Sequence, residues 1–218
     1  MELRSLRLTT ISLFVIACLV LTAHARIVEI PPWVANPNNP TYAGGSSLHA
    51  EWDFTRNPTQ AQWSSHNFPI TSQPPSIAFP PGSTYPDVVI GPTGNPIPTW
   101  HVGSDGEIEI FVPNSNVPRP FKDILLQITS DKGSSSVPTA NGTPGTPSSI
   151  AGFPGGSAWY TYGYKFHLEP NPPFEIIKIP AVFSTNVDQI VIDTICYTPE
   201  PAALSLVAFA LPLLLRRR

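Results

Sequence analysis

Hydrophobic and polar residues alternate along much of the chain, and a period of two is typical of β-strands that bury one face. The longest alternating stretch, 158–169, carries Ala, Tyr, Tyr, Tyr, Phe and Leu on one face and mostly polar residues on the other. Residues 106–112 and 122–129 alternate in the same way. Shorter stretches predict five more strands, at 48–54, 87–90, 98–102, 174–179 and 187–197. Residues 26–198 show no convincing helical period, so these strands predict an all-β, antiparallel β-sandwich of jelly-roll-like type.

Turn residues suggest how some of these strands connect. Ser104-Asp105-Gly106 lies between two predicted strands, and an Asp-Gly pair can take the positive φ of a tight hairpin. The Pro-rich residues 169–173 end the aromatic strand, and we expect a second hairpin there. Residues 67–98 contain nine Pro, and 130–157 are rich in Ser, Thr, Gly and Pro. We expect long Pro/Gly-rich loops in both stretches, the second of them mobile.

Residues 1–25 have the layout of a secretory signal peptide. Arg4 and Arg7 precede an apolar run at 11–21, and the small residues Ala23 and Ala25 occupy the −3 and −1 positions of the expected cleavage site. We therefore expect a signal helix that is removed, leaving a chain that begins at residue 26. One alternative is an uncleaved anchor, although the run of 11 residues is short against the roughly 20 that span a bilayer. The other is lipidation of Cys18, although the apolar run continues beyond it.

The last 20 residues, 199–218, form a second distinct segment. The tripeptide Pro199-Glu200-Pro201 is followed by 14 residues without a charge and then by Arg216, Arg217 and Arg218. A helix of that length covers about 21 Å, short of a hydrocarbon core of roughly 30 Å, so it is marginal as a permanent anchor. The terminal arginines favour the cytoplasmic side. The competing interpretation is a buried C-terminal helix with a solvated basic tail.

The order of tripeptide, short apolar segment and terminal arginine cluster resembles the PEP-CTERM sorting signal. That resemblance implies that an exosortase, a membrane enzyme, recognises Pro199, Glu200 and Pro201 and cuts near them, while Arg216, Arg217 and Arg218 hold the chain in the membrane until then. It implies export machinery and an exosortase-like enzyme as partners, and display at the cell surface or in the extracellular matrix of bacteria that make exopolysaccharide. The resemblance covers about 20 residues and assigns no activity to 26–198.

Composition and charge narrow the class of protein. Charged residues make up 12% of the chain, about half the usual share of roughly 25%, and 28 Pro argue against coiled coils and helical bundles. The net charge is −3 for the whole chain, and seven basic and thirteen acidic residues give −6 for 26–198, so a nucleic-acid partner is not expected. Cys196 is the one cysteine in 26–198, which excludes an internal disulfide there.

Candidate catalytic chemistry is sparse. The chain has no nucleophile elbow, phosphate loop, zinc-protease helix, Cys-x-x-Cys pair or EF-hand loop, and no cofactor is expected. His49, Glu51 and Asp53 occupy alternate positions of one predicted strand, so they share a face and form a candidate metal site. A solvated strand face is the competing interpretation. A second candidate cluster combines His101 with the two acidic residues of 107–109 across the expected hairpin.

Tryptophans offer a different hypothesis, since an exposed indole can stack on a sugar ring. Trp159 falls on the polar face of the aromatic strand and is the candidate carbohydrate contact, whereas Trp52 alternates in phase with Leu48 and Phe54 and is expected in the core. The first functional hypothesis is a non-enzymatic, exported surface or matrix protein. The alternatives are a carbohydrate-binding module that acts on exopolysaccharide and, third, an extracellular glycan-acting enzyme, which would need carboxylates facing one another across a groove.

Deleting residues 199–218 tests the sorting hypothesis. Without the tripeptide, the apolar segment and the arginines, we expect the protein to pass into the medium, because nothing would halt it in the membrane. Immunoblotting of cell and medium fractions measures the change. Unchanged retention at the surface after the deletion contradicts the hypothesis.

Overall fold

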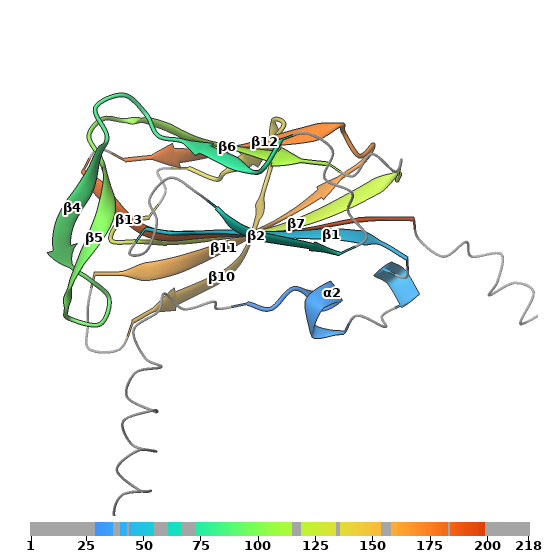
Figure 1. Ribbon diagram of the computed structural model, residues 1–218, viewed down its shortest axis with the longest axis horizontal. Helices are drawn as coiled ribbons and strands as arrows, with labels where there is room; N and C mark the ends of the chain where they lie inside the picture. The colour runs from blue at the N-terminus through green and yellow to red at the C-terminus, as the bar shows by residue number, and fades with distance from the viewer. Residues whose placement is uncertain are drawn as a thin grey trace, which may run out of the picture.

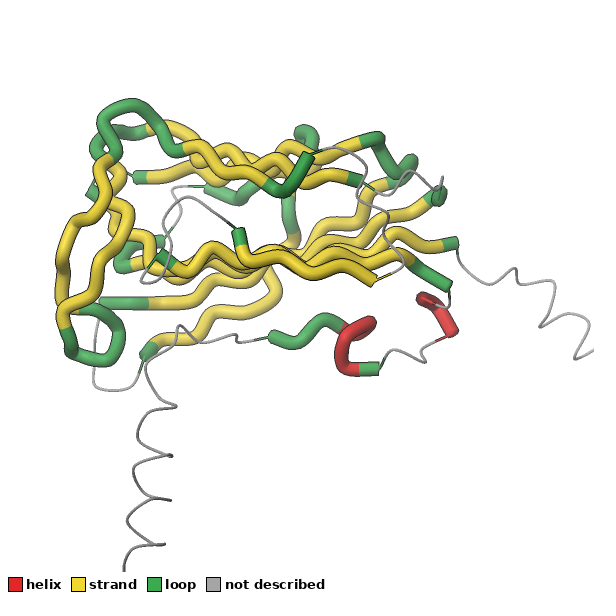
Figure 2. Tube along the Cα trace, in the orientation of Figure 1, coloured by secondary structure: helices red, strands yellow, loops and turns green. Residues whose placement is uncertain are grey.

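The computed structural model describes residues 29–36, 40–42, 44–54, 61–66, 73–114, 119–133, 136–153, 158–182 and 184–198. Two antiparallel sheets pack face to face in this part of the chain, as the two layers of Figure 1 and the strand colouring of Figure 2 show. The predicted all-β antiparallel sandwich is therefore confirmed. The expected cleavage site, Ala23 and Ala25, and the sorting segment 199–218 lie outside the described residues, as do the helices expected at the two ends.

The large sheet has eight strands, with β10, β11, β7, β13, β1 and β2 in spatial order and the β4–β5 pair attached to β13. Their bounds are β1 Ser46–Asp53, β2 Gln62–His66, β4 Thr84–Ile90, β5 Pro96–Val102, β7 Phe121–Ser130, β10 Thr146–Gly152, β11 Tyr160–Leu168 and β13 Thr185–Tyr197. The small sheet has the order β3, β6, β12, β8 and β9. Its bounds are β3 Ser76–Ala78, β6 Gly106–Pro113, β8 Thr139–Ala140, β9 Thr143–Pro144 and β12 Phe174–Ala181.

Alternating residues fill the space between the sheets as the sequence pattern predicts. Ile108, Ile110 and Val112 of β6 are buried, whereas Glu107 and Glu109, which alternate with the isoleucines, are exposed. Trp52 has no exposed surface, which confirms its expected place in the core. Strand β13 differs, because all 13 of its residues are buried. It pairs with β7 on one side and with β1 and β5 on the other, so it is the central strand of the large sheet.

Neither expected hairpin forms. Strand β5 belongs to the large sheet and β6 to the small one, so Ser104-Asp105-Gly106 carries the chain from one sheet to the other. Gly106 has no positive φ, and a Cβ there would lie 2.8 Å from Pro80, so the glycine permits a close approach. Residues 169–173 also join different sheets, from β11 to β12. Such changes of sheet are what a jelly-roll-like sandwich requires.

The expectation of a mobile loop at 130–157 was wrong for much of its length. Strands β8, β9 and β10 lie within it, and β10 pairs with the aromatic strand β11. β10 is an edge strand whose side chains are mostly exposed, so its order comes from backbone hydrogen bonds that leave little hydrophobic pattern. In the described residues, no helix is long and apolar enough to span a membrane.

Two isoleucines allow a matched test of the core. Ile192 in β13 has no exposed surface and Ile150 in β10 is 70% exposed. Ile192→Ala should lower the free energy of unfolding by about 2–5 kcal/mol because it leaves a cavity between the sheets. Ile150→Ala should change it by about 0.5 kcal/mol or less. Urea unfolding measures both, and equal losses would contradict the sandwich.

Candidate functional site

The N-terminal segment covers part of the large sheet on the face that points away from the small sheet, here called the outer face. The segment contains the short helices α2 (Pro32–Ala35) and η1 (Pro40–Tyr42), and Figure 1 shows α2 on the side opposite β6 and β12. The Gln127 side chain accepts from the Glu29 backbone N–H and donates to the Glu29 carbonyl, both at 3.0 Å. Trp33 packs there in a second apolar cluster with Leu125, Ile195 and Tyr197.

Strand register places two His–Asp pairs on the outer face. His167 of β11 lies opposite Asp123 of β7, and His49 of β1 lies opposite Asp193 of β13. His167 Nδ1 is 2.6 Å from Asp123 Oδ1, and His49 Nδ1 is 2.8 Å from Asp193 Oδ1. Because β7 and β13 are neighbours, the two carboxylates come from adjacent strands.

Asp123 organises the aromatic residues around it. The Tyr42 hydroxyl donates to Asp123 Oδ2 at 3.3 Å, and the Tyr42 ring meets Tyr197 edge-on with centroids 5.0 Å apart. Burial, and after it the negative charge of Asp123, raises the pKa of both tyrosines. The His167 ring stacks on Phe121 at 5.6 Å, so its orientation is fixed as well.

His49 is held by two acidic residues. Besides Asp193, its Nε2 lies 3.8 Å from Glu51 Oε2, and Glu51 Oε1 accepts from Gln189 Nε2 at 2.6 Å. The hydrogen bond to Asp193, followed by the interaction with Glu51, raises the pKa of His49 to about 9. The imidazolium is therefore the prevailing form at neutral pH, and a protonated imidazole does not bind a metal ion.

The candidate metal site His49, Glu51 and Asp53 is not assembled. Asp53 is 8% exposed and lies near Asp188, whose pKa is raised to about 7 by burial and by the charge on Asp53. Within the described residues, no three His, Cys, Asp or Glu side chains are grouped to hold a metal ion. His49 pairs instead with Asp193 of the neighbouring strand β13.

Two hollows open on the outer face on either side of Trp33. One has a volume of about 250 Å³ and is lined by Trp33, Tyr42, Asp123, Lys165 and His167 among others. The second has a volume of about 290 Å³, and its lining includes Trp33, Ser47, His49, Ser64 and Asp193. Each hollow thus combines an aromatic wall with a His–Asp pair, and we call them the Tyr42 hollow and the Ser64 hollow.

The Trp159 prediction was wrong. Trp159 is only 3% exposed, and its Nε1 donates to the Ile90 carbonyl at 2.9 Å, so its ring is not available to a sugar. It precedes β11 and packs against the β4–β5 end, where the strand alternation no longer applies. Trp63 on edge strand β2 is 43% exposed instead.

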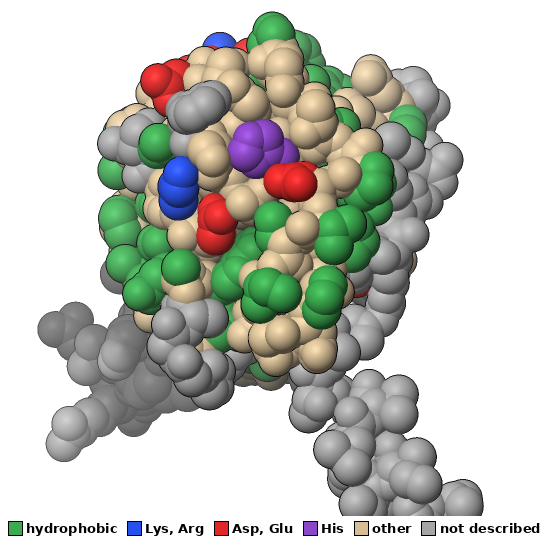
Figure 3. Space-filling view, turned by 90° about the vertical axis from the view of Figure 1, so that its left-hand side faces the viewer, with side chains coloured by type: hydrophobic (Ala, Val, Ile, Leu, Met, Phe, Trp, Pro, Cys, Tyr) green, Lys and Arg blue, Asp and Glu red, His purple; other side chains and the backbone are tan. Residues whose placement is uncertain are grey.

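The second candidate cluster is also not formed. His101 Nδ1 lies 3.4 Å from Asp87 Oδ2 and 3.1 Å from Asn186 Oδ1. Glu107 and Glu109 both form ion pairs with Lys178. These three residues lie in the small sheet, whereas His101 lies in the large sheet. Figure 3 looks onto the β4–β5 end, where a histidine lies beside acidic side chains and near hydrophobic ones.

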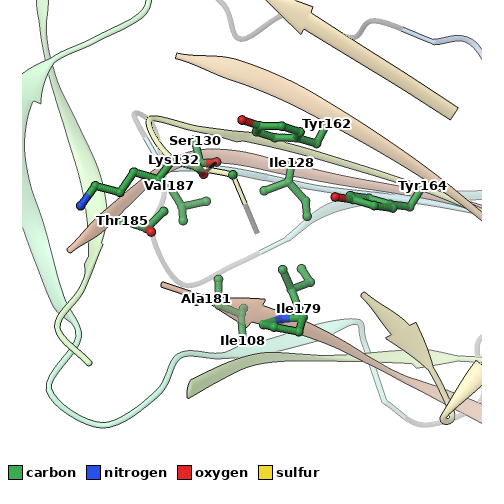
Figure 4. Close-up of a pocket in the computed structure, with 12 residues that line it drawn as sticks. Ile108, Ile128, Ser130, Lys132, Tyr162, Tyr164, Ile179, Ala181, Thr185 and Val187 are labelled. Carbon is green, nitrogen blue, oxygen red and sulfur yellow. Dashed lines mark hydrogen bonds between the residues drawn. The ribbon is translucent and has the colours of Figure 1, made fainter. Parts of the chain in front are cut away.

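A third hollow lies between the sheets. Figure 4 shows Ile128, Tyr162 and Tyr164 on one side of it and Ile108 and Ile179 on the other. Its volume of about 20 Å³ is enough for about one water molecule, so it is a packing gap.

Sequence reasoning missed Trp33, Tyr42, Asp123, His167 and Asp193 as site residues. Asp123 and His167 lie on the polar faces of the two most regular predicted strands. They come together because β7 pairs with β11. The local alternation of polar and apolar residues does not specify which strands pair. Trp33 lies outside every predicted strand, so it gave no signal.

Comparisons with known proteins give little further information. No family model matches the chain, and no curated protein matches it. Among solved structures, the chain is similar to the native structure of a family 35 carbohydrate binding module from Clostridium thermocellum, at 21% identity and a TM-score of 0.32. The match covers 54% of this chain and 90% of the module. The site described above therefore stands on this chain's own residues.

The raised pKa of His49 predicts a pH-dependent stability. Its stabilising charge is fully present below the unfolded pKa near 6.5 and is lost as the pH rises through about 9. The free energy of unfolding of the wild type should therefore fall relative to that of His49→Gln between these pH values. Urea unfolding at each pH measures the difference.

Asp193→Asn provides the control for this titration. It removes the main partner of His49, so the pH-dependent difference should flatten. A difference between wild type and His49→Gln that stays constant from pH 6.5 to pH 9 contradicts the assignment.

Proposed function

We propose that this chain is an exported, non-enzymatic surface or matrix protein whose β-sandwich binds carbohydrate on the outer face of the large sheet. The observation that carries the binding proposal is the pair of hollows beside Trp33, each with a His–Asp pair in its lining. The surface or matrix role rests on the sequence of the two ends, and the binding role rests on the outer face.

The lining of the Tyr42 hollow suits a sugar. Sugar rings have apolar C–H faces that pack on aromatic rings, and the half-buried Tyr42 supplies such a surface beside the edge of Trp33, which is 8% exposed. Sugar hydroxyls both donate and accept, and hydrogen bonds to charged groups are the stronger ones. Asp123, His167 and Lys165 supply an acceptor and donors within the same hollow.

The size of the hollows fits a short stretch of a glycan. Small-molecule sites begin at roughly 300 Å³, and the two hollows, at about 250 and 290 Å³, reach that range only when they are taken together. Because Trp33 lines both, a chain of sugars that occupies one hollow can continue past the indole into the other. An extended polysaccharide therefore suits the site better than an isolated monosaccharide.

A binding role fits the carboxylates better than catalysis does. Glycoside hydrolysis needs two carboxyl groups, one to transfer a proton and one to act as nucleophile or base. Asp123 and Asp193 each accept a hydrogen bond from a histidine, which holds the carboxylates in fixed orientations. Acceptors held in fixed orientations suit recognition, because they present one constant hydrogen-bonding pattern to the hydroxyls of a bound sugar.

His167→Ala and Lys165→Ala test the binding site in the full-length protein. Both side chains are about half exposed, at 53% and 48%, so their removal should leave the fold intact. Each should weaken binding to an exopolysaccharide by about tenfold, since a hydrogen bond to the glycan is lost. A glycan array followed by calorimetry on the best ligand measures the change.

Phe174→Ala is the matched control, because Phe174 is an aromatic residue that is 44% exposed on the small sheet. Its affinity should equal that of the wild type. Binding of no glycan above background, or an equal loss in the Phe174 variant, overturns the proposal.

A further inference from the structure

A charged residue from each sheet points into the core at one end of the sandwich. Lys122 precedes Ile124 in the inward phase of β7, and Glu175 precedes Ile177 in the inward phase of β12. Both side chains are completely buried, and Lys122 Nζ is in direct contact with Glu175 Oε2. Removing two charges from water costs about as much free energy as their mutual attraction provides, so a buried ion pair does not by itself stabilise a fold. The pair therefore calls for another explanation.

Asn114 completes the group. It follows the last residue of β6, and its Nδ2 donates to Glu175 Oε1 at 3.3 Å and to the Pro172 carbonyl. Its Oδ1 accepts from Cys196 Sγ at 2.8 Å, and Cys196 is the cross-strand neighbour of Lys122. One carboxyl group thus contacts an amine through one oxygen and a carboxamide through the other.

We propose that Lys122 and Asn114 become joined by an isopeptide bond, which forms within the folded chain with loss of ammonia and with Glu175 as the proton-transferring group. The chemistry needs an amine, an amide and a group that moves protons between them. The amine and the carboxyl group are completely buried, and the amide of the partly buried Asn114 contacts the same carboxyl group. It requires no oxidant, cofactor or second protein. This inference does not depend on the carbohydrate-binding proposal.

The steps balance as follows. A proton moves from Lys122 Nζ to Glu175, because two neutral groups are favoured over two charges in a buried site. The Nζ lone pair then forms a bond to Cγ of Asn114, and the carbonyl electron pair moves to Oδ1. Glu175 gives its proton to Nδ2 and takes one from Nζ, the Cγ–Nδ2 bond breaks, and ammonia leaves. The products are a neutral secondary amide and a protonated Glu175.

The surroundings match these roles. Burial raises the pKa of Glu175 to about 7 against the opposing effect of the Lys122 charge, so the carboxyl group can hold and release a proton near neutral pH. The Cys196 thiol points at Oδ1, the atom on which negative charge develops after the attack. Contacts of Nδ2 with Asn171 and Pro172 fix the plane of the amide.

The bond would link the end of β6 in the small sheet to the start of β7 in the large sheet. It would also replace a buried ion pair with an uncharged amide, which removes the cost of keeping two charges away from water. The product is therefore better suited to the core than the reactants are.

Tryptic mapping of the full-length protein, purified and denatured, tests the proposal directly. Trypsin cuts after a free Lys122 and releases peptide 57–122, whereas an acylated Lys122 resists and leaves peptide 57–132. We expect 57–132 with a mass about 17 Da below that of its sequence, the loss of one ammonia, and fragment ions that join Asn114 to Lys122. Peptide 57–122 at full mass overturns the proposal. A loss of about 17 Da within 57–122 also overturns it, because that result means cyclisation of Asn114 on its own backbone.

Two variants assign the roles. Lys122→Arg keeps a positive charge for Glu175, but a guanidinium stays protonated and cannot attack, so peptide 57–122 should appear at full mass. Glu175→Gln should reduce the cross-linked peptide by about tenfold or more, because general acid–base assistance is lost. Far-UV circular dichroism checks that each variant folds. The peptide map of the wild type does not depend on whether either variant folds. A loss of ammonia that persists in Lys122→Arg contradicts the assignment.

Discussion

Strand β13 shares its backbone hydrogen bonds with β7 on one side and with β1 and β5 on the other, and none of its 13 residues is exposed. A strand buried on both faces needs a cover on each side of its sheet. The small sheet covers the inner face, and the N-terminal segment with Trp33 covers part of the outer one. The sandwich is thus three layers thick along its centre, and the third layer is what gives the outer face its hollows.

Partial cover explains why the polar residues of the outer face are paired. Only 19% of the Asp123 side chain and 8% of the Asp193 side chain are exposed, so each carboxylate is held away from much of the solvent and needs a partner. The adjacent strand supplies a histidine at the same level in both cases. The same arrangement that satisfies these carboxylates orients them toward the hollows. The same His–Asp contacts therefore satisfy the partly buried carboxylates and orient them for binding.

Local sequence predicted this fold well where one face is buried, and poorly elsewhere. The alternation at 106–112 identified the inward face of β6, because burial on one side imposes a period of two. Strand β10 gave no such signal, since its backbone pairs while its side chains stay exposed. Asp105-Gly106 was misleading because a turn motif specifies local geometry and not the sheet that the next strand joins. The site residues could not be predicted for a related reason, since Asp123 and His167 meet only through a pairing of strands about 40 residues apart.

The strand at the centre of the large sheet is the last of the described strands to be made. Until residues 185–197 have been synthesised, β7, β1 and β5 each lack a neighbour along one edge. An unpaired edge is a template for any other chain that comes near it. Pairings between residues so distant in sequence also form slowly, since the chain between them must be closed into a large loop. Because β13 is synthesised after the strands it pairs with, the large sheet is completed late. Until then, the unpaired edges of β1, β5 and β7 need protection from other chains.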